Sequence, residues 1–337
     1  MTYSVLVRQF DEPIAVKKGQ TILDAALRAG EDYPFSCRSG ACSSCKSQLF
    51  SGEVEHGSFD PAALSDEERA SGLILACRAK PVSDCEVAFL EDDESLFSPA
   101  TNPCSITSVE RVTHDVAIVR AKPLGGQPLS FAAGQFASLT LPGFPSRDYS
   151  FANRPGSPEL EFHVRVRAGG IVSRHIYETA AAGDRFSVYG PLGAAYLRKD
   201  HPGPITMVVG GTGLAPARSI LLEALAALPG RPIALFFSAR EDRDLYYTDE
   251  MTALAASRPH FEFHPIATRS QDAAEAPRTV FSLVAERFEN LRGHTVYTCG
   301  SPSLVSACQA FAAGMGVTAA DCHADPFVSA EQQQIAV

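Results

Sequence analysis

The chain has 337 residues, which is enough for two or three domains that each bury a core. Its net charge of −10 argues against nucleic acid as a partner, and 45% hydrophobic with 20% charged residues is ordinary for a globular protein. No apolar run approaches the roughly 18 residues that cross a bilayer. Because Met1–Ser4 leads into a strand pattern without a secretory signal, we expect no membrane association.

Charge is distributed unevenly along the chain. Residues 1–95 carry 9 basic and 17 acidic side chains, residues 96–199 carry 11 and 7, and residues 200–337 carry 9 and 15. We therefore expect the basic middle segment to hold an anionic cofactor.

The first elements precede a cysteine-rich loop. Tyr3–Gln9 alternates as a strand, and Pro13–Val16 completes a hairpin. Thr21 is a suitable N-cap for a helix that Gly30 ends.

Four cysteines have the spacing of a plant-type [2Fe–2S] site. Cys37, Cys42 and Cys45 follow the pattern C-x4-C-x2-C, and Cys77 lies well downstream, after the apolar run Leu73–Ala76. The small residues between the first three allow backbone N–H groups to point at cluster sulfurs. The spacing therefore predicts these four cysteines as the ligands of a [2Fe–2S] cluster.

Two other uses of cysteine fit less well. A zinc site more often has C-x2-C pairs at both ends, and a disulfide framework belongs to short secreted chains. Nine cysteines with a cluster among them indicate a reducing cytosol. Ser43 stands where such loops usually carry glycine, and this should cost backbone freedom without affecting the ligands.

The N-terminal segment 1–95 resembles the plant-type ferredoxin fold, a β-grasp. A strand is expected at Ser47–Ser51 after the cysteine loop. The acidic run 91–94 and the segment 98–103 indicate a linker.

Short strands broken by Gly and Pro follow, and they predict an antiparallel β-barrel over residues 96–200. One helix, Ser173–Ala180, interrupts them. The expected strands are Ile106–Arg111, Val116–Ala121, Phe136–Leu141, Leu160–Val166 and Arg185–Tyr189.

From residue 201 to 337 the pattern changes to strands alternating with helices, which predicts a doubly wound parallel sheet. The expected strands are Ile205–Val209, Ile233–Ser238, Phe261–Ile266 and His294–Cys299. The expected helices are Ala215–Leu228, Thr248–Ser257, Val280–Phe288 and Pro302–Met315. The fold class is thus multidomain, α+β and α/β.

Two further motifs suggest nucleotide binding. Gly210-Gly211-Thr212-Gly213 lies where the first strand of the sheet turns into its helix, a position where glycines let a backbone approach a pyrophosphate. Arg147-Asp148-Tyr149-Ser150 offers a cation, a ring and a hydroxyl to a flavin nucleotide. Each motif is weak by itself, because an ordinary corner or strand would also use these residues.

Taken together and in order, the motifs Arg147-x-Tyr149-Ser150, Gly210–Pro216 and Cys299-Gly300-Ser301-Pro302 resemble those of the ferredoxin–NADP⁺ reductase superfamily. With a plant-type ferredoxin at the N-terminus, the chain is similar to reductase components of bacterial aromatic ring-hydroxylating dioxygenases. Gly190–Arg198 is most similar to the reductases of naphthalene-dioxygenase-type systems, which pass electrons to a separate Rieske ferredoxin.

The resemblance implies roles for individual residues. Those expected to bind FAD are Arg147, Tyr149, Ser150, His163, Val164, Arg165, Gly170 and Ser173, with the last five on the diphosphate side. Those expected to bind NADH are Gly210, Gly211, Thr212, Gly213, Arg240, Cys299 and Gly300. Ser150 and Cys299 are expected nearest the reacting atoms, and Asp325 and Phe327 in the C-terminal tail are expected beside the cofactors.

Some of these residues have ordinary structural roles that fit as well. Cys299 is also suited to be a small buried residue, and Phe327 to C-terminal packing. NADH is favoured over NADPH by the resemblance, although Arg240 could also meet a 2′-phosphate.

The resemblance implies a monomeric NADH-dependent reductase that passes electrons from NADH to FAD, then to the [2Fe–2S] cluster, and then to a Rieske ferredoxin or a terminal oxygenase. The alternatives are a reductase for a diiron monooxygenase or a sugar-nucleotide deoxygenase, and a non-catalytic redox sensor.

Overall fold

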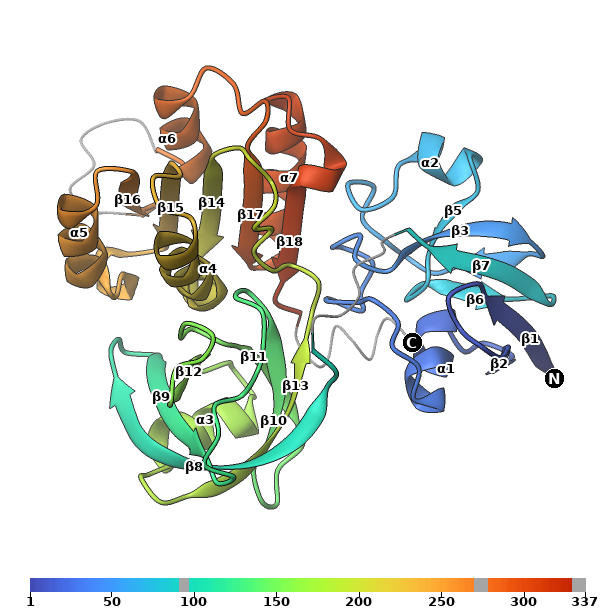
Figure 1. Cartoon of the computed structure of the whole chain (residues 1–337), viewed down its shortest axis with the longest axis horizontal. Helices are drawn as coiled ribbons and strands as arrows, with labels where there is room; N and C mark the ends of the chain where they lie inside the picture. The colour runs from blue at the N-terminus through green and yellow to red at the C-terminus, as the bar shows by residue number, and fades with distance from the viewer. Residues whose placement is uncertain (91–96, 270–277, 329–337) are drawn as a thin grey trace. The chain divides into compact units, whose positions relative to one another are not determined.

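The computed structural model describes residues 1–90, 97–269 and 278–328. Two compact units are distinguished (Figure 1). The first comprises Met1–Leu96, Ser301–Ala310 and Ala324–Val337, and the second comprises Phe97–Gly300 and Phe311–His323. The acidic run 91–94 lies outside the described residues, and the domain boundaries predicted at 95/96 and 200/201 stay predictions.

The first unit contains a five-stranded sheet with the order β2-β1-β7-β3-β5. Its strands are β1 (Thr2–Val7), β2 (Ile14–Lys17), β3 (Lys46–Ser51), β5 (Leu73–Leu75) and β7 (Cys85–Phe89). β1 pairs antiparallel with β2 and parallel with β7, as in a β-grasp. The core includes Val5, Val7, Leu23, Ile74 and Val87, all buried.

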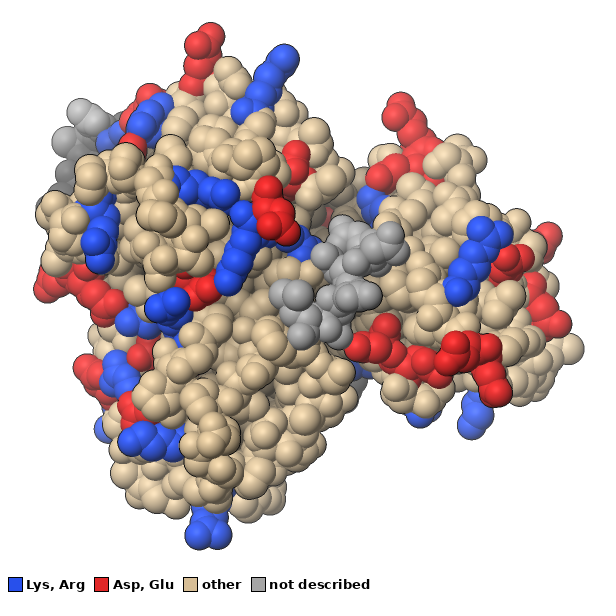
Figure 2. Space-filling view, viewed as in Figure 1, with Lys and Arg blue, Asp and Glu red and all other residues tan. Residues whose placement is uncertain are grey.

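Helix α1 (Ile22–Ala29) packs on this core with the expected ends. Thr21 Oγ1 accepts a hydrogen bond from the N–H of Asp24 at 3.2 Å, and Gly30 has a left-handed φ of 85°. Acidic side chains form a row over the region of α1 in the view of Figure 2.

Four elements of this unit were not predicted. They are β7 at the centre of the sheet, β4 (Val54–His56) with its partner β6 (Ala79–Pro81), and α2 (Asp66–Ala70). Ser65 and Glu68 form a capping box at the start of α2, a four-residue signal that was legible in the sequence.

A six-stranded antiparallel sheet with the order β11-β10-β13-β8-β9-β12 forms the barrel of the second unit. Its strands are β8 (Ala100–Arg111), β9 (Val116–Pro123), β10 (Phe136–Thr140), β11 (Arg147–Ser150), β12 (Leu160–Arg165) and β13 (Arg185–Leu192). A bridge between Phe151 and Phe162 joins the two end strands and closes the barrel. The predicted helix is α3 (Ile171–Glu178).

The second sheet runs in the order β16-β15-β14-β17-β18, and its first four strands pair in parallel. Its strands are β14 (Ile205–Gly210), β15 (Ile233–Ala239), β16 (Phe261–Ala267), β17 (Thr295–Gly300) and β18 (Cys322–Pro326). Its helices are α4 (Leu214–Ala227), α5 (Thr248–Ser257), α6 (Val280–Arg287) and α7 (Pro302–Gly314). The strand order reverses between β14 and β17, which is the topological switch point where doubly wound sheets bind ligands.

The barrel and the parallel sheet of the second unit share one hydrophobic core. Val116 and Ile118 of β9 pack in the same cluster as Met207 of β14 and Leu235 of β15. Within the described part of the chain, no helix combines the length and the apolar character that a bilayer crossing requires.

Candidate functional site

The four predicted cluster ligands are buried in the first unit. The N–H of Cys37 donates to Cys42 Sγ at 3.4 Å, and the N–H of Cys77 donates to Cys45 Sγ at 3.4 Å. Cys37 Sγ accepts from the N–H groups of Ser39 and Ala41 at 3.4 and 3.3 Å. The loop therefore directs backbone donors at sulfur, as an iron–sulfur site requires.

The loop backbone uses left-handed conformations at Arg38 (φ 55°), Gly40 (φ 80°) and Ser43 (φ 66°). The strain expected at Ser43 is therefore present, since a side chain is held where glycine is favoured. Ser43 Oγ donates to the carbonyl of Ala63 at 3.0 Å, which offsets part of that cost.

The thiols interact strongly with one another. A hydrogen bond with Cys42 lowers the pKa of Cys37, with help from the N–H groups of Ser39 and Ala41. The same contact and burial raise the pKa of Cys42, and Cys45 and burial raise that of Cys77. All nine cysteines lie in described parts of the chain, and none forms a disulfide. Four buried thiols in mutual contact, with amide donors around them, fit a [2Fe–2S] cluster.

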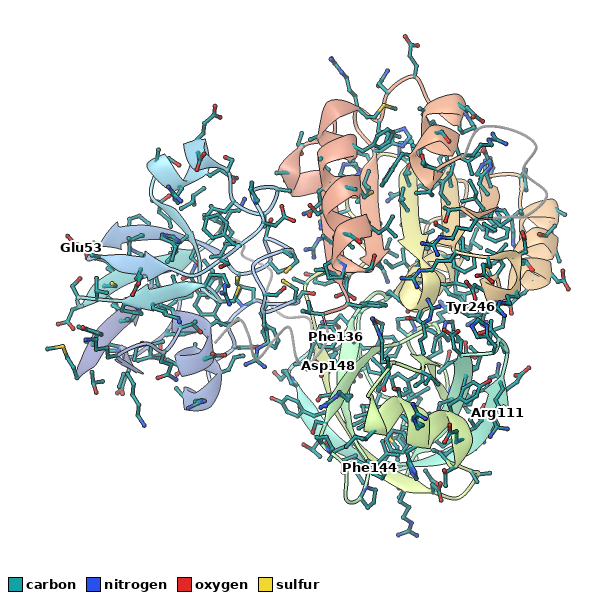
Figure 3. The ribbon with its side chains drawn as sticks, turned by 180° about the vertical axis from the view of Figure 1, so that it is seen from behind. Glu53, Arg111, Phe136, Phe144, Asp148 and Tyr246 are labelled. Carbon is teal, nitrogen blue, oxygen red and sulfur yellow. The ribbon has the colours of Figure 1, made fainter. Side chains whose placement is uncertain are left out.

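The predicted flavin motif lies on β11, paired with β10 (Figure 3, where Asp148 and Phe136 mark the two strands). Ser150 is buried, opposite Phe136 in the register, and Arg147 and Tyr149 are half-buried. Burial raises the pKa of Tyr149 to about 12, while the nearby charge of Arg147 opposes the shift. The phenol thus stays neutral and able to pack on a ring.

Several arginines gather beside β11. Partial burial, then the charges of Arg165 and Arg240, lower the pKa of Arg167. Arg165 Nε donates to Asp115 Oδ2 at 2.6 Å. A concentration of guanidinium groups of this kind fits the phosphates of a dinucleotide.

The start of α3 is also suited to phosphate. Gly170 occupies its N-cap, no side chain hydrogen bond caps it within the described residues, and its first turn lacks an acidic residue. Ser173 Oγ donates to the carbonyl of Gly170 at 3.3 Å, and a Cβ on Gly170 would lie 2.7 Å from Ser173 Oγ. The first N–H groups of the helix are therefore open to an anion.

The predicted nicotinamide residues meet at the switch point. The turn Gly211–Gly213 follows β14, and a Cβ on Gly213 would lie 2.1 Å from the carbonyl oxygen of Cys299. Cys299 is buried and pairs with Val209, and Gly300 has a φ of 142° that favours glycine. Gly210 and Thr212 are half-buried on the same turn. The close approach leaves no room for a side chain at Gly213.

Arg165 connects the two halves of this site. Besides its bond to Asp115, its Nη1 lies 3.2 Å from the position of a Cβ on Gly211. The residue predicted for the flavin diphosphate therefore also touches the turn predicted for NADH, and Val164 beside it is buried in β12.

His163, which is predicted to contact the flavin diphosphate, is buried and hydrogen-bonded within the protein. Its Nδ1 lies 2.8 Å from Tyr246 Oη and its Nε2 lies 3.3 Å from Glu161 Oε1. Burial lowers its pKa against the opposing effect of Glu161, so the ring is neutral. Since a carboxylate only accepts, Nε2 carries the proton and Nδ1 accepts from Tyr246. Both ring nitrogens of His163 are therefore engaged within the protein, and its cofactor role stays a prediction.

Glu161 is the centre of a network that sequence reasoning missed. Its Oε2 accepts from Arg120 Nε at 3.0 Å, and its Oε1 accepts from Arg218 Nη1 and Tyr247 Oη, both at 3.2 Å. Burial favours the neutral acid, but the hydrogen bond from His163 and the charge of Arg218 outweigh it and lower the pKa of Glu161 to about 2.

We call Glu161, His163, Arg120, Arg218 and Tyr247 the Glu161 network. Arg120 and His163 come from the barrel, whereas Arg218 lies on α4 and Tyr247 precedes α5. Figure 3 labels Tyr246, the partner of His163, where barrel and parallel sheet meet. The network fixes one relative to the other within the second unit.

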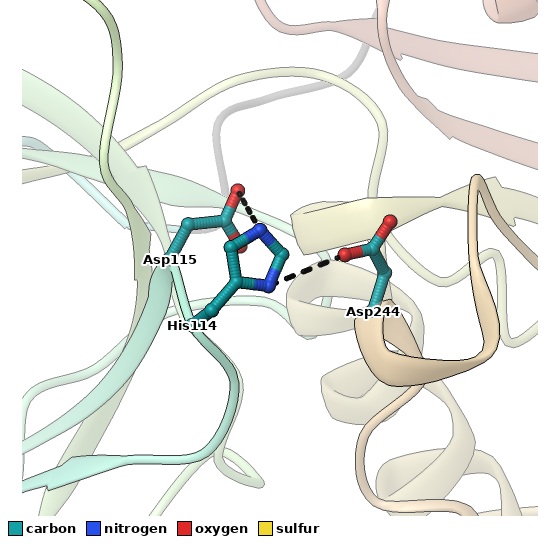
Figure 4. Close-up of side chains that lie close together, drawn as sticks. All are labelled: His114, Asp115 and Asp244. Atoms are coloured by element: carbon teal, nitrogen blue, oxygen red, sulfur yellow. Dashed lines mark ion pairs between the residues drawn. The ribbon is translucent and has the colours of Figure 1, made fainter.

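A smaller group joins the same two parts (Figure 4). His114 Nδ1 lies 3.5 Å from Asp244 Oδ1, and His114 Nε2 lies 4.0 Å from Asp115 Oδ2. One ligand atom from each of these three side chains lies within 4.8 Å of the others, but the two carboxylates face different ring nitrogens and Asp115 already binds Arg165.

The remaining predicted residues lie in separate places. Arg240 is exposed at the end of β15, where its carbonyl accepts from the N–H of Arg269 at 2.8 Å. Asp325 is buried in the first unit and accepts a hydrogen bond from Ser36 Oγ at 2.9 Å. Phe327 is half-buried. The cofactor roles of all these residues stay predictions.

Three domain families match the chain in the predicted order. They are a 2Fe-2S iron-sulfur cluster binding domain over residues 7–82, an oxidoreductase FAD-binding domain over 103–196 and an oxidoreductase NAD-binding domain over 207–310. These matches confirm the predicted fold class and the predicted cofactors, [2Fe–2S], FAD and NAD.

Full-length relatives have the same composition of domains. The chain is 33% identical, over 96% of its length and 98% of the relative, to the ferredoxin–NAD(P)⁺ reductase component of the naphthalene 1,2-dioxygenase/salicylate 5-hydroxylase systems of Ralstonia. It is 38% identical, over 91% and 93%, to an aromatic O-demethylase reductase subunit from Amycolatopsis. An Amycolatopsis cytochrome P450 reductase of known structure superposes with a TM-score of 0.76 at 34% identity, covering 97% of this chain and 99% of that one.

Proposed function

The chain belongs to the family of iron–sulfur flavoprotein reductases that serve as reductase components of oxygenase systems, and from this we propose its acceptor and the roles of its residues. It is an NADH-dependent ferredoxin reductase, an oxidoreductase with domains that bind a [2Fe–2S] cluster, FAD and NAD. The observation that carries the proposal is the buried group of four thiols, with backbone donors aimed at sulfur, in the same chain as a dinucleotide-binding switch point.

FAD supplies the step between two-electron chemistry with NADH and one-electron chemistry with the cluster. We propose that Arg147 and Tyr149 bind the flavin nucleotide and that Ser150, buried on β11, donates to the flavin ring. The first turn of α3, from Gly170 to Ser173, would hold the diphosphate with Arg165. The guanidinium groups around Tyr149 support this assignment.

On the nicotinamide side, the turn Gly210–Gly213 would bind the pyrophosphate and Cys299 with Gly300 would border the nicotinamide. The Gly213–Cys299 approach supports this, because it leaves no room for a side chain that could cover the edge. Arg240, at the end of β15, would lie near the adenosine ribose. Asp325 and Phe327 are proposed to lie at the cofactor side of the C-terminal tail.

For the acceptor, we propose a Rieske ferredoxin or a terminal oxygenase of an aromatic ring-hydroxylating dioxygenase, with a basic docking surface. The excess of 17 acidic over 9 basic side chains in residues 1–95 supports a basic partner, and the cluster adds negative charge. A monooxygenase acceptor is the second candidate, since relatives also include a phenol 2-monooxygenase reductase component.

The acceptor is tested by mixing the purified protein with NADH and a Rieske ferredoxin at rising salt concentration. We expect reduction of the ferredoxin at a rate that falls steeply with ionic strength. Fast NADH–ferricyanide turnover without reduction of any Rieske protein would contradict the dioxygenase assignment. Failure to turn over any acceptor would instead favour a redox sensor.

We also propose that the protein is a monomer, that it prefers NADH to NADPH, and that it works in a reducing cytosol. The absence of disulfides among its nine cysteines supports the compartment. The ratio of kcat/KM for NADH and NADPH, and the mass measured by light scattering, test the other two.

A further inference from the structure

Two arginines follow cluster ligands directly, yet their environments differ. Arg38 comes after Cys37, has a side chain 43% exposed to solvent, and pairs with Asp24 Oδ1 at 2.9 Å. Arg78 comes after Cys77 and is only 5% exposed. The chain therefore carries the same cation beside two ligands of one site, once in water and once in the interior.

Arg78 packs under the cysteine loop. A Cβ on Gly40, within the loop, would lie 2.9 Å from Arg78 Cγ, and a Cβ on Gly57 would lie 2.7 Å from Arg78 Nη2. Arg78 Nε donates to the carbonyl of Ser58 at 2.7 Å, and the carbonyl of Arg78 accepts from the N–H of Gly57 at 2.9 Å. The two glycines thus leave the space that this side chain fills.

The contacts also place the guanidinium. Its Nη2, Cζ and Nε lie 2.7, 3.1 and 3.2 Å from the Cβ position of Gly57, and Cζ is three bonds from the Cγ atom that packs against Gly40. The hydrogen bond to Ser58 fixes it there, in an interior where a charge is screened far less than at the surface.

Such a charge acts on the cluster's redox equilibrium. Reduction adds one electron, and therefore one negative charge, to four thiolates and their irons, and a fixed cation nearby favours that state. An exposed arginine has little effect, because solvent screens its charge.

We propose that the buried charge of Arg78 raises the reduction potential of the [2Fe–2S] cluster, and so favours electron transfer from the flavin. The proposal deepens the function proposed above and rests on the cluster being present. It concerns the potential alone, which is measured with neither NADH nor an acceptor protein.

The test compares R78Q, R78K and the matched control R38Q in the full chain. Cluster content is first measured from iron, sulfide and the visible spectrum, and the potential is then measured by anaerobic titration with redox dyes followed by electron paramagnetic resonance. We expect R78Q to shift the equilibrium about tenfold toward the oxidised cluster, which is about 59 mV for one electron. R78K should shift it by less than about threefold and R38Q by less than about twofold.

Two results would overturn the proposal. The first is a potential without the expected pattern: either R78Q holds its cluster at the wild-type potential, or R38Q shifts the potential as much as R78Q does. The second concerns how much cluster the variants hold. R78M keeps the buried stem without the charge, and if R78Q and R78M both fail to hold a cluster while R78K holds one, the role of Arg78 is structural. A wild-type protein that holds no cluster would instead refute the proposed function.

Discussion

The cluster loop and the flavin–nicotinamide site are built in opposite ways. Three of the four cluster ligands lie within nine residues, and backbone N–H groups order their sulfurs. The second site draws on β11, β12, α3, the β14–α4 turn and β17, from Arg147 to Gly300. Side-chain ion pairs, above all the Glu161 network, join β9 and β12 of the barrel to α4 of the parallel sheet. A local site depends on its own loop, whereas a dispersed site depends on the ion pairs that join its elements.

The largest expected effect separates the two sites. Cys42→Ser removes a cluster ligand and should lower electron transfer to a protein acceptor at least about 100-fold, while NADH-dependent ferricyanide reduction is kept. The control is Cys85→Ser, a buried cysteine of β7 with hydrogen bonds to backbone carbonyls, which should leave both rates unchanged. Transfer to the acceptor at the wild-type rate in Cys42→Ser would contradict the electron path.

Gly213→Ala tests the dispersed site where it is tightest. The added Cβ would lie 2.1 Å from the carbonyl oxygen of Cys299, so the turn must move. We expect kcat/KM for NADH to fall about 10- to 100-fold, with FAD and iron content unchanged. Gly314→Ala is the control, because no atom lies within 4 Å of its Cβ position. Equal kinetics for the two variants would show that the turn does not bind NADH.

Glu161→Gln asks whether a residue away from the cofactors supports the dispersed site. It leaves Arg120 and Arg218 without a buried carboxylate, which should cost about 3 kcal/mol of stability and lower NADH–ferricyanide turnover about tenfold. Glu250→Gln removes the other, 41% exposed partner of Arg218 and should cost less than about 1 kcal/mol. Stopped-flow kinetics and denaturant unfolding measure both, and equal effects would refute a special role for Glu161.

The stability difference between wild type and Glu161→Gln should also depend on pH, which is a smaller but more specific effect. Because the pKa of Glu161 is lowered from 4.5 to about 2, its stabilisation is complete above pH 4.5 and is lost as the pH falls toward 2. The stability gap between wild type and Glu161→Gln should be constant from pH 7 to 5.5 and shrink below pH 4.5. A gap that is unchanged at pH 3 would show that the charge of Glu161 is not its source.

The same contrast explains what could be predicted from the sequence. The cluster ligands could be identified because their spacing is local, and Thr21 and Gly30 could be identified as the caps of α1 because capping is local too. The role of Glu161 could not be predicted, because its partners Arg120, Arg218 and Tyr247 are far away in sequence. Its only signal was a charged residue between Leu160 and Phe162 in an apolar strand.

His163 shows what a sequence motif does not determine about a side chain. A motif resemblance implies that it lies on the flavin diphosphate side, which stays a prediction, whereas the partners of its ring nitrogens, Tyr246 and Glu161, could only be found in the fold. Arg167, which contributes to the arginine group, lies three residues before the predicted Gly170 and was not singled out. A motif identifies which strand borders a cofactor, whereas the partners of each side chain depend on the tertiary fold.

The most direct test of the central claim is an anaerobic visible spectrum of the purified protein before and after one equivalent of NADH. The account predicts flavin bands with a cluster shoulder, and loss of absorbance in both on adding NADH. A protein whose flavin is bleached while the cluster absorbance is unchanged, even with excess NADH, would contradict transfer from FAD to the cluster. A yellow protein without iron would contradict the cluster itself.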